Sequence, residues 1–272
     1  MALTSKHSAP LRAWCAAAGV AALTVLLSAC VAPAAPPSQD LRTESDQTDA
    51  DRRARVRMEL ASAYFGRGQN TTALDEVKLA LQAKPDLPEA HNLRGLIYAR
   101  MGEHGLAEDS FRRALQLSPR DADTMHNYGW YLCQQRRFPE AEAQFNAALA
   151  VPNYRELTRT LLAQGVCQAR NNQWAEAERS LQRSYELDPA NAATAVNLSE
   201  VLLRRGEPER ARFYIRRVNN NDQLVSAQTL WLAARIEHKL GETAQVRALG
   251  IQLLNRFPQS PEATLYEKGQ FE

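Results

Sequence analysis

From about residue 54 onward, apolar residues recur at helical spacing, and the whole pattern repeats at intervals close to 34 residues. One row of small residues occupies equivalent places in six segments: Ala61, Gly95, Gly129, Gly165, Ser199 and Ala234. A second row follows twelve residues later: Ala73, Ala107, Ala141, Ala177, Ala211 and, as an exception, Val246. Small side chains in such rows let neighbouring helices approach closely.

Larger apolar residues and prolines complete the pattern. The apolar row is Val77, Phe111, Phe145, Leu181 and Ile215, and Gly250 interrupts it in the sixth segment. Prolines close five segments at Pro85, Pro119, Pro152, Pro189 and Pro258, where they prevent the helix from continuing. This register resembles the tetratricopeptide repeat. The resemblance implies an all-α fold, a right-handed α-solenoid of about six repeats and about twelve helices over residues 54–260, with residues 261–272 as a C-terminal tail.

The N-terminus has a different pattern. Lys6 and Arg12 precede an apolar run at residues 14–27, which is short for a membrane span and typical of a signal peptide. The run ends in LSAC, which resembles a lipoprotein processing site. That resemblance implies removal of residues 1–29 and lipidation of Cys30, whereas an ordinary secretory signal with a chance cysteine is the alternative. Residues 30–53, rich in Pro, Ala and polar residues, are expected to be a lipidated N-terminus and flexible tether.

Charge and motifs exclude several functions. Removing the two signal-peptide cations from 33 leaves 31 basic against 31 acidic residues, which gives no basis for nucleic-acid binding. No HExxH, GxSxG, Walker A or dinucleotide-binding motif occurs. Carboxylates such as Glu140, Glu142, Glu176 and Glu178 lie on repeating helix faces, where a solvated surface is expected. We therefore predict a protein that is not an enzyme, with no cofactor and no small-molecule substrate.

The cysteines of the mature chain would be Cys30, Cys133 and Cys167, so two remain once Cys30 is assigned to lipid. Cys133 and Cys167 lie 34 residues apart, in the first helices of consecutive repeats. Those helices are neighbours, and an oxidising periplasm favours a disulfide between them. Two independent buried thiols are the alternative. Two cysteines alone are too few to hold zinc, so no metal site is predicted.

The first helices of such repeats line a concave surface that usually holds a peptide or a partner helix. Trp130 follows the small Gly129 at a position that faces this groove, and His126 lies one turn earlier on the same face. The predicted groove residues are Phe65, Asn92, Leu96, His126, Trp130, Leu162 and Val166. The alternative for Trp130 is packing against the neighbouring repeat. Further along, the groove becomes charged, with Glu200, Arg204, Arg235 and His238.

The segment NYGWYLCQQRRFPEAEAQF, residues 127–145, followed by Cys167, resembles the PilF/PilW family of type IV pilus biogenesis lipoproteins. The LSAC site, the short tether and six repeats agree with that family. The resemblance implies lipidation of Cys30, a bridge between Cys133 and Cys167, and a location on the periplasmic face of the outer membrane. It also implies a pilotin role, in which the protein helps the outer-membrane secretin to localise and multimerise, with the secretin or associated pilus proteins as partners. Tetratricopeptide lipoproteins of outer-membrane protein assembly, cell division or polysaccharide export are the alternative.

Overall fold

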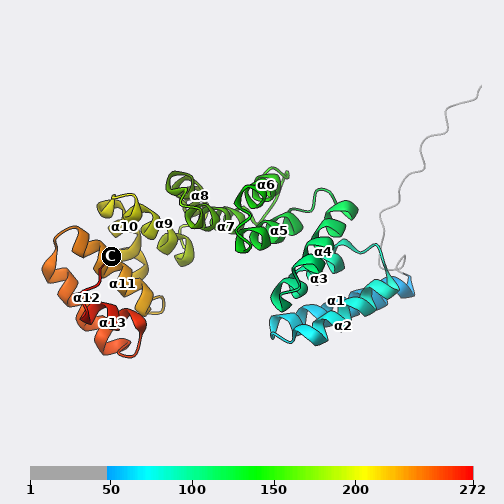
Figure 1. Ribbon diagram of the computed structural model, residues 1–272, viewed down its shortest axis with the longest axis horizontal. Coiled ribbons are helices and arrows are strands. Elements are labelled where there is room, and N and C mark those ends of the chain that lie inside the picture. Colours follow the sequence, from blue (N-terminus) through cyan, green and yellow to red (C-terminus); the bar gives the residue numbers. More distant parts are fainter. Residues whose placement is uncertain (1–47, 272) are drawn as a thin grey trace, which may run out of the picture. The chain divides into compact units, whose positions relative to one another are not determined.

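The helices follow from the repeat pattern. The computed structural model describes residues 48–271, and these residues form thirteen α-helices (Figure 1). The helices are α1 (Asp49–Gly66), α2 (Asn70–Ala83), α3 (Pro88–Met101), α4 (His104–Leu117), α5 (Ala122–Gln134), α6 (Phe138–Leu149), α7 (Leu157–Arg170), α8 (Trp174–Leu187), α9 (Ala192–Arg204), α10 (Pro208–Asn219), α11 (Ala227–Lys239), α12 (Thr243–Arg256) and α13 (Pro261–Glu267). The expected signal peptide, Cys30 and most of the expected tether lie outside the described residues.

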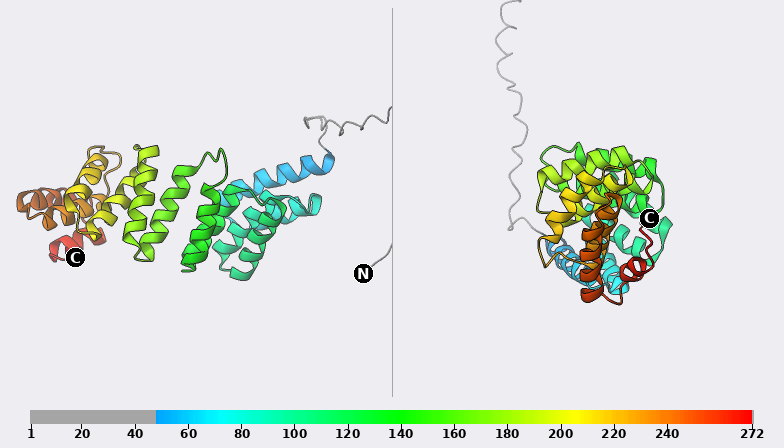
Figure 2. Two further views of the ribbon diagram at one scale, coloured as in Figure 1. Left: turned by 90° about the horizontal axis from the view of Figure 1, so that it is seen from above. Right: turned by 90° about the vertical axis from the view of Figure 1, so that its left-hand side faces the viewer.

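The first twelve helices form six antiparallel pairs that stack in sequence order (Figure 2). Within each pair the two helices contact each other along their length, and the second helix packs against the first helix of the next pair. Odd-numbered helices from α1 to α11 also contact one another in succession, so they form one continuous wall. The predicted all-α fold of paired helices is confirmed.

Small residues set the spacing within pairs. A Cβ atom added to Gly95 would lie 2.8 Å from the ring of Phe111, and one added to Gly165 would lie 2.6 Å from Cγ of Leu181. Gly129 lies against Phe145 in the same way. Phe111, Phe145 and Leu181 are themselves fully buried. The glycines are therefore required because a large apolar side chain occupies the space that their own side chain would fill.

The sixth pair departs from the pattern because α13 covers it. Gly250 stands where other repeats have a large apolar residue, and a Cβ atom there would overlap the ring of Tyr266 from α13. Phe271 then places its ring 5.1 Å from that of Trp231 and 4.3 Å from that of His238, both in α11. The C-terminal residues thus pack on the last repeat and shield its apolar edge.

Helix α1 starts five residues before the expected boundary at residue 54. Thr48 caps it: the Thr48 hydroxyl accepts a hydrogen bond from the Asp51 backbone N–H, while the Asp51 carboxylate accepts one from the Thr48 backbone N–H. Lys84 at the end of α2 lies 2.7 Å from the same carboxylate. Its hydrogen bond, together with those from Thr48, lowers the pKa of Asp51.

We predict that Gly165→Ala lowers the free energy of unfolding. Forcing a methyl group against Leu181 and the Ala177 carbonyl should outweigh the gain in helix propensity, for a net loss of about 1–2 kcal/mol. Chemical denaturation followed by circular dichroism measures the change. Gly105→Ala in α4 is the control, because no atom lies within 4 Å of its added Cβ. Equal effects of the two substitutions would contradict the close-packing argument.

Candidate partner-binding groove

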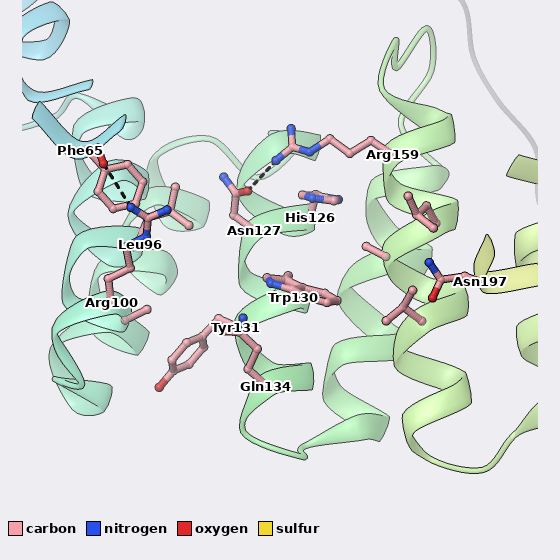
Figure 3. A pocket seen from close by; sticks show the side chains of 14 residues that line it. Phe65, Leu96, Arg100, His126, Asn127, Trp130, Tyr131, Gln134, Arg159 and Asn197 are labelled. Atoms are coloured by element: carbon pink, nitrogen blue, oxygen red, sulfur yellow. Dashed lines mark hydrogen bonds between the residues drawn. The ribbon is translucent and has the colours of Figure 1, made fainter. Parts of the chain in front are cut away.

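The odd-numbered helices enclose a hollow of about 640 Å³ on the wall that they share (Figure 3). Its lining comes from the end of α1 and from α3, α5, α7 and α9. The lining residues are Phe65, Leu96, Ala99, Arg100, His126, Asn127, Trp130, Tyr131, Gln134, Arg159, Leu162, Ala163, Val166 and Asn197. Apolar side chains from successive helices therefore meet in one cavity, although they are up to about a hundred residues apart in the sequence.

Six of the seven predicted groove residues line this hollow: Phe65, Leu96, His126, Trp130, Leu162 and Val166. Asn92 does not line it. Its side-chain oxygen instead accepts a hydrogen bond from Nδ2 of Asn127, 3.2 Å away, so its amide links α3 to α5. That the six residues bind a partner stays a prediction.

Trp130 has contacts on more than one side. Its indole is partly buried against the core that includes Tyr131, Cys133 and Cys167. The guanidinium of Arg170 lies 5.0 Å from the centre of the indole ring, within the range of a cation–π contact. Trp130 therefore packs against the neighbouring repeat and also exposes part of its ring to the hollow (Figure 3). Packing and groove-facing, posed as alternatives by the sequence, occur together.

His126 is more deeply buried than a simple polar contact residue. Only 5% of it is exposed, and Nδ1 lies 2.9 Å from the hydroxyl of Thr160. That hydroxyl is also 2.9 Å from the hydroxyl of Tyr154, in the connection between α6 and α7. Burial lowers the pKa of His126 to about 4, and the positive charge of Arg159 adds to this effect. The ring is therefore neutral at neutral pH and is held in place by the hydroxyl pair.

Two arginines at the hollow are absent from the predicted groove. Arg100 lies 4.3 Å from the ring centre of Phe65 and donates a hydrogen bond to the Phe65 carbonyl. Arg159 donates one to the side-chain oxygen of Asn127 (Figure 3). No acidic side chain lines this hollow within residues 48–271. Helical spacing could have predicted that both arginines lie on the groove face, because Arg100 lies four residues after Leu96 and Arg159 lies three residues before Leu162.

A disulfide joins the helices beneath the hollow. Cys133 of α5 and Cys167 of α7 are bonded, with their Cα atoms 5.8 Å apart, inside the usual range for disulfides. Both residues are buried. A cross-link of this kind stabilises a fold by roughly 2–4 kcal/mol, chiefly by restricting the unfolded chain. It also fixes the distance between the helices that carry Trp130 and Val166.

One carboxylate was wrongly expected to be solvated. Glu178 is 7% exposed, in the interface between repeats, where it forms ion pairs with Arg205 and Arg210. Both arginines belong to the following repeat, at the turn after α9 and at the start of α10. A repeating surface position becomes buried here because the next repeat covers it with two cations. An unpaired charge at such a site would be costly, so the ion pairs allow the burial.

Comparison with known proteins places these features in a family. Models described as tetratricopeptide repeat match residues 86–153, 128–192 and 168–230, and a TPR repeat model matches residues 61–102. The type IV pilus assembly protein PilF of Pseudomonas aeruginosa is 26% identical over 247 residues, which cover 90% of this chain and 95% of PilF. The crystal structure of PilW, a type IV pilus biogenesis factor, aligns with a TM-score of 0.72 and 29% identity, over 78% of this chain and 96% of PilW. The chain belongs to the PilF/PilW family of type IV pilus assembly proteins.

Other comparisons agree with this assignment. An uncharacterized protein of Haemophilus influenzae is 32% identical over 131 residues, which cover 47% of this chain and 66% of that protein. A solved structure of Pseudomonas aeruginosa PilF aligns with a TM-score of 0.71 at 24% identity, which supports the shared fold. The PilF/PilW family consists of tetratricopeptide scaffolds rather than enzymes, in agreement with the motif analysis.

Within residues 48–271 this PilF/PilW protein has no group of three or more His, Cys, Asp or Glu side chains placed to hold a metal ion. In the same range, no helix has the length and apolar character needed to cross a bilayer.

We predict that His126 makes the stability of this PilF/PilW protein depend on pH. Between pH 6.5 and about 4 the unfolded chain binds a proton that the folded state excludes, so stability falls as the pH falls. His126→Gln should therefore lose less stability on acidification than the wild type, by roughly 1–2 kcal/mol between pH 6.5 and pH 5. Urea denaturation at the two pH values measures the difference. The exposed His104, replaced by Gln, is the control; if both variants match the wild type, His126 does not carry the effect.

Proposed function

We propose that this protein is a lipid-anchored pilotin of the type IV pilus, which binds a segment of the outer-membrane secretin, or of an associated pilus protein, in the groove around Trp130. The observation that carries the proposal is the apolar hollow shared by five successive odd-numbered helices. A family role in type IV pilus assembly supports the biological setting. Within that setting, the secretin is the proposed partner and its assembly is the proposed outcome.

The physical case rests on what the hollow exposes. Leu96, Leu162 and Val166 are only partly buried, and with Trp130 they form an apolar floor. An apolar surface of this kind gains free energy when a partner covers it. Aromatic residues in such a floor often act as anchors that account for a large share of binding energy. The cations Arg100 and Arg159 at the same hollow favour a segment that carries carboxylates or backbone carbonyls beside its apolar residues.

Rigidity strengthens the case. The disulfide joins α5 to α7, and the Thr160 hydroxyl joins His126 of α5 to the start of α7. These two connections fix the two central helices of the floor against each other. A floor that does not need to order itself on binding loses less entropy, so more of the contact energy appears as affinity.

The anchoring part of the proposal concerns the N-terminus. Cys30 would carry the acyl chains, and residues 30–47 together with Thr48 would connect them to α1. Several acyl chains on one residue give stable attachment to a bilayer, whereas one gives marginal binding. The mature chain has equal numbers of acidic and basic residues, so its net charge would not hold it on a membrane.

We predict that Trp130→Ala weakens secretin multimer assembly while the helical fold is retained. Loss of the indole should cost about 2 kcal/mol or more of binding free energy if it is an anchor. Secretin multimers from complemented deletion strains are compared on gels that preserve them. Trp174→Ala is the matched control, since Trp174 is also partly buried but packs against a different core.

Circular dichroism and thermal denaturation establish whether Trp130→Ala folds. If it does not, Val166→Gln tests the same floor with a smaller change in packing. Normal multimers with a folded Trp130→Ala variant would contradict the groove. Normal multimers in the deletion strain itself would instead indicate that the protein serves another envelope assembly.

We predict that Cys30→Ala releases the protein into the soluble periplasmic fraction, because the acyl chains provide the membrane attachment. Membrane fractionation is carried out in a strain that lacks the secretin, so that partner binding cannot retain the variant. Ser28→Thr, a change beside the processing site that keeps the cysteine, serves as the control. Outer-membrane recovery of Cys30→Ala at the wild-type level would rule out the lipid anchor.

A further inference from the structure

A second hollow of about 520 Å³ lies at the C-terminal end of the same helix wall. It is formed by the ends of α9 and α11 and by the residues that follow α13, which reach α11 at the C-terminal end of the described chain (Figure 1). Its lining residues are Leu203, Arg204, Arg235, His238, Lys239, Gly269 and Phe271. The capping segment therefore both covers the last repeat and forms one side of this hollow.

This hollow is linked to the groove around Trp130 by a third hollow that borders both. An intermediate hollow of about 290 Å³ shares Asn197 with the first and Arg235 with the second. The first hollow extends from α1 to α9, whereas the other two both lie between α9 and α11, the far one at the C-terminal ends of these helices. An extended segment that follows these neighbouring hollows would pass from the apolar floor over Asn197 and Arg235 to the far hollow.

The charge of the lining differs between the groove around Trp130 and the far hollow. Three cations, Arg204, Arg235 and Lys239, line the far hollow, and no carboxylate lines it within the described residues. We refer to it as the cationic hollow. Glu200, in the intermediate hollow, has its carboxylate 2.8 Å from Arg235 and 3.0 Å from Arg204. Among the described residues, Glu200 thus pairs with two of the three cations, and an excess of positive charge remains.

The arginine geometry suits an anion. Glu200 accepts hydrogen bonds from both terminal nitrogens of Arg235, while Nε of Arg235 is buried and has no partner. A buried donor without a partner costs free energy that an incoming acceptor can recover. Lys239 is exposed and forms no ion pair among the described residues, so its ammonium is available to a ligand.

We propose that the cationic hollow binds acidic side chains of the partner segment whose apolar residues occupy the floor around Trp130. The inference rests on the proposed function, since it assigns a second subsite to the same segment. Guanidinium groups pair well with carboxylates, and the apolar walls from Leu203 and Phe271 reduce the solvent screening of such pairs. The partner segment would then have apolar residues at one end and acidic residues at the other, which sets its direction in the groove.

A peptide is the favoured anion because of where the hollow lies. It is a recess on the same helix wall, and the intermediate hollow shares lining residues both with it and with the groove around Trp130. Charge complementarity at the end of such a groove raises the association rate and fixes the register of the bound segment.

Calorimetry with hexaglutamate, at low ionic strength, tests the subsite directly. The wild-type protein should bind it, and Arg204→Gln/Lys239→Gln should bind it about tenfold more weakly. The double variant Arg183→Gln/Arg247→Gln removes the same net charge from exposed arginines that line neither hollow, and it should bind as the wild type does. Hexaglutamine is the uncharged probe and should not bind.

Three results would overturn the proposal. The first is equal binding of hexaglutamate by wild type and Arg204→Gln/Lys239→Gln. The second is an equal loss in the control double variant, because the effect would then be one of net charge. The third is binding of phosphatidylglycerol vesicles that depends on Arg204 and Lys239 in the absence of hexaglutamate binding, because the anion would then be a lipid.

The same variants separate this inference from the proposed function. Trp130→Ala should leave hexaglutamate binding unchanged, since Trp130 does not line the cationic hollow. If the wild-type protein does not bind hexaglutamate but Trp130→Ala still impairs secretin assembly, only the acidic subsite is overturned. Hexaglutamate binding that depends on Arg204 and Lys239, together with normal secretin assembly in every variant, would support the acidic subsite and overturn the secretin as its partner.

Discussion

The close approach of two helices at a residue with almost no side chain is the constraint on which the rest of the fold depends. Gly129 and Gly165 admit Phe145 and Leu181 into contact with the backbone of the partner helix. That contact fixes the distance and rotation of each pair. Rotation in turn decides which face of the first helix points toward the common wall. A groove residue such as Trp130 is thus placed by the glycine that precedes it.

Because the pairs stack on one another, the orientation set within each pair produces an extended surface. Each repeat contacts only its neighbours, so the same placement recurs from pair to pair and aligns side chains that are distant in sequence. Variation in those side chains makes the surface differ along its length. Around Trp130 it is apolar, and around Arg235 it is charged. The backbone geometry is the same in every repeat, so differences in binding along the surface come from the side chains that vary between repeats.

Much of the fold and of the groove could be predicted because it depends on positions that recur in every repeat. Six groove residues and the two bridged cysteines occupy positions that the period itself defines. Errors arose where a residue of another segment decides the environment. Glu178 is buried because Arg205 and Arg210 of the following repeat cover it. Gly250 interrupts the apolar row because Tyr266, outside the repeat pattern, fills the space. A periodic pattern carries no information about such partners.

The bond between Cys133 and Cys167 also limits how far the chain could extend under mechanical tension. Tension applied along the chain would pass through the two sulfur atoms and bypass the residues between them. The 34 positions spanned by the bond correspond to roughly 110 Å of extended chain that could not be drawn out while the bond is intact. Repeats on either side could yield and recover, whereas the segment from α6 to most of α7 would keep its length. The region beneath the groove would therefore be the part of the molecule with the least capacity to extend under load.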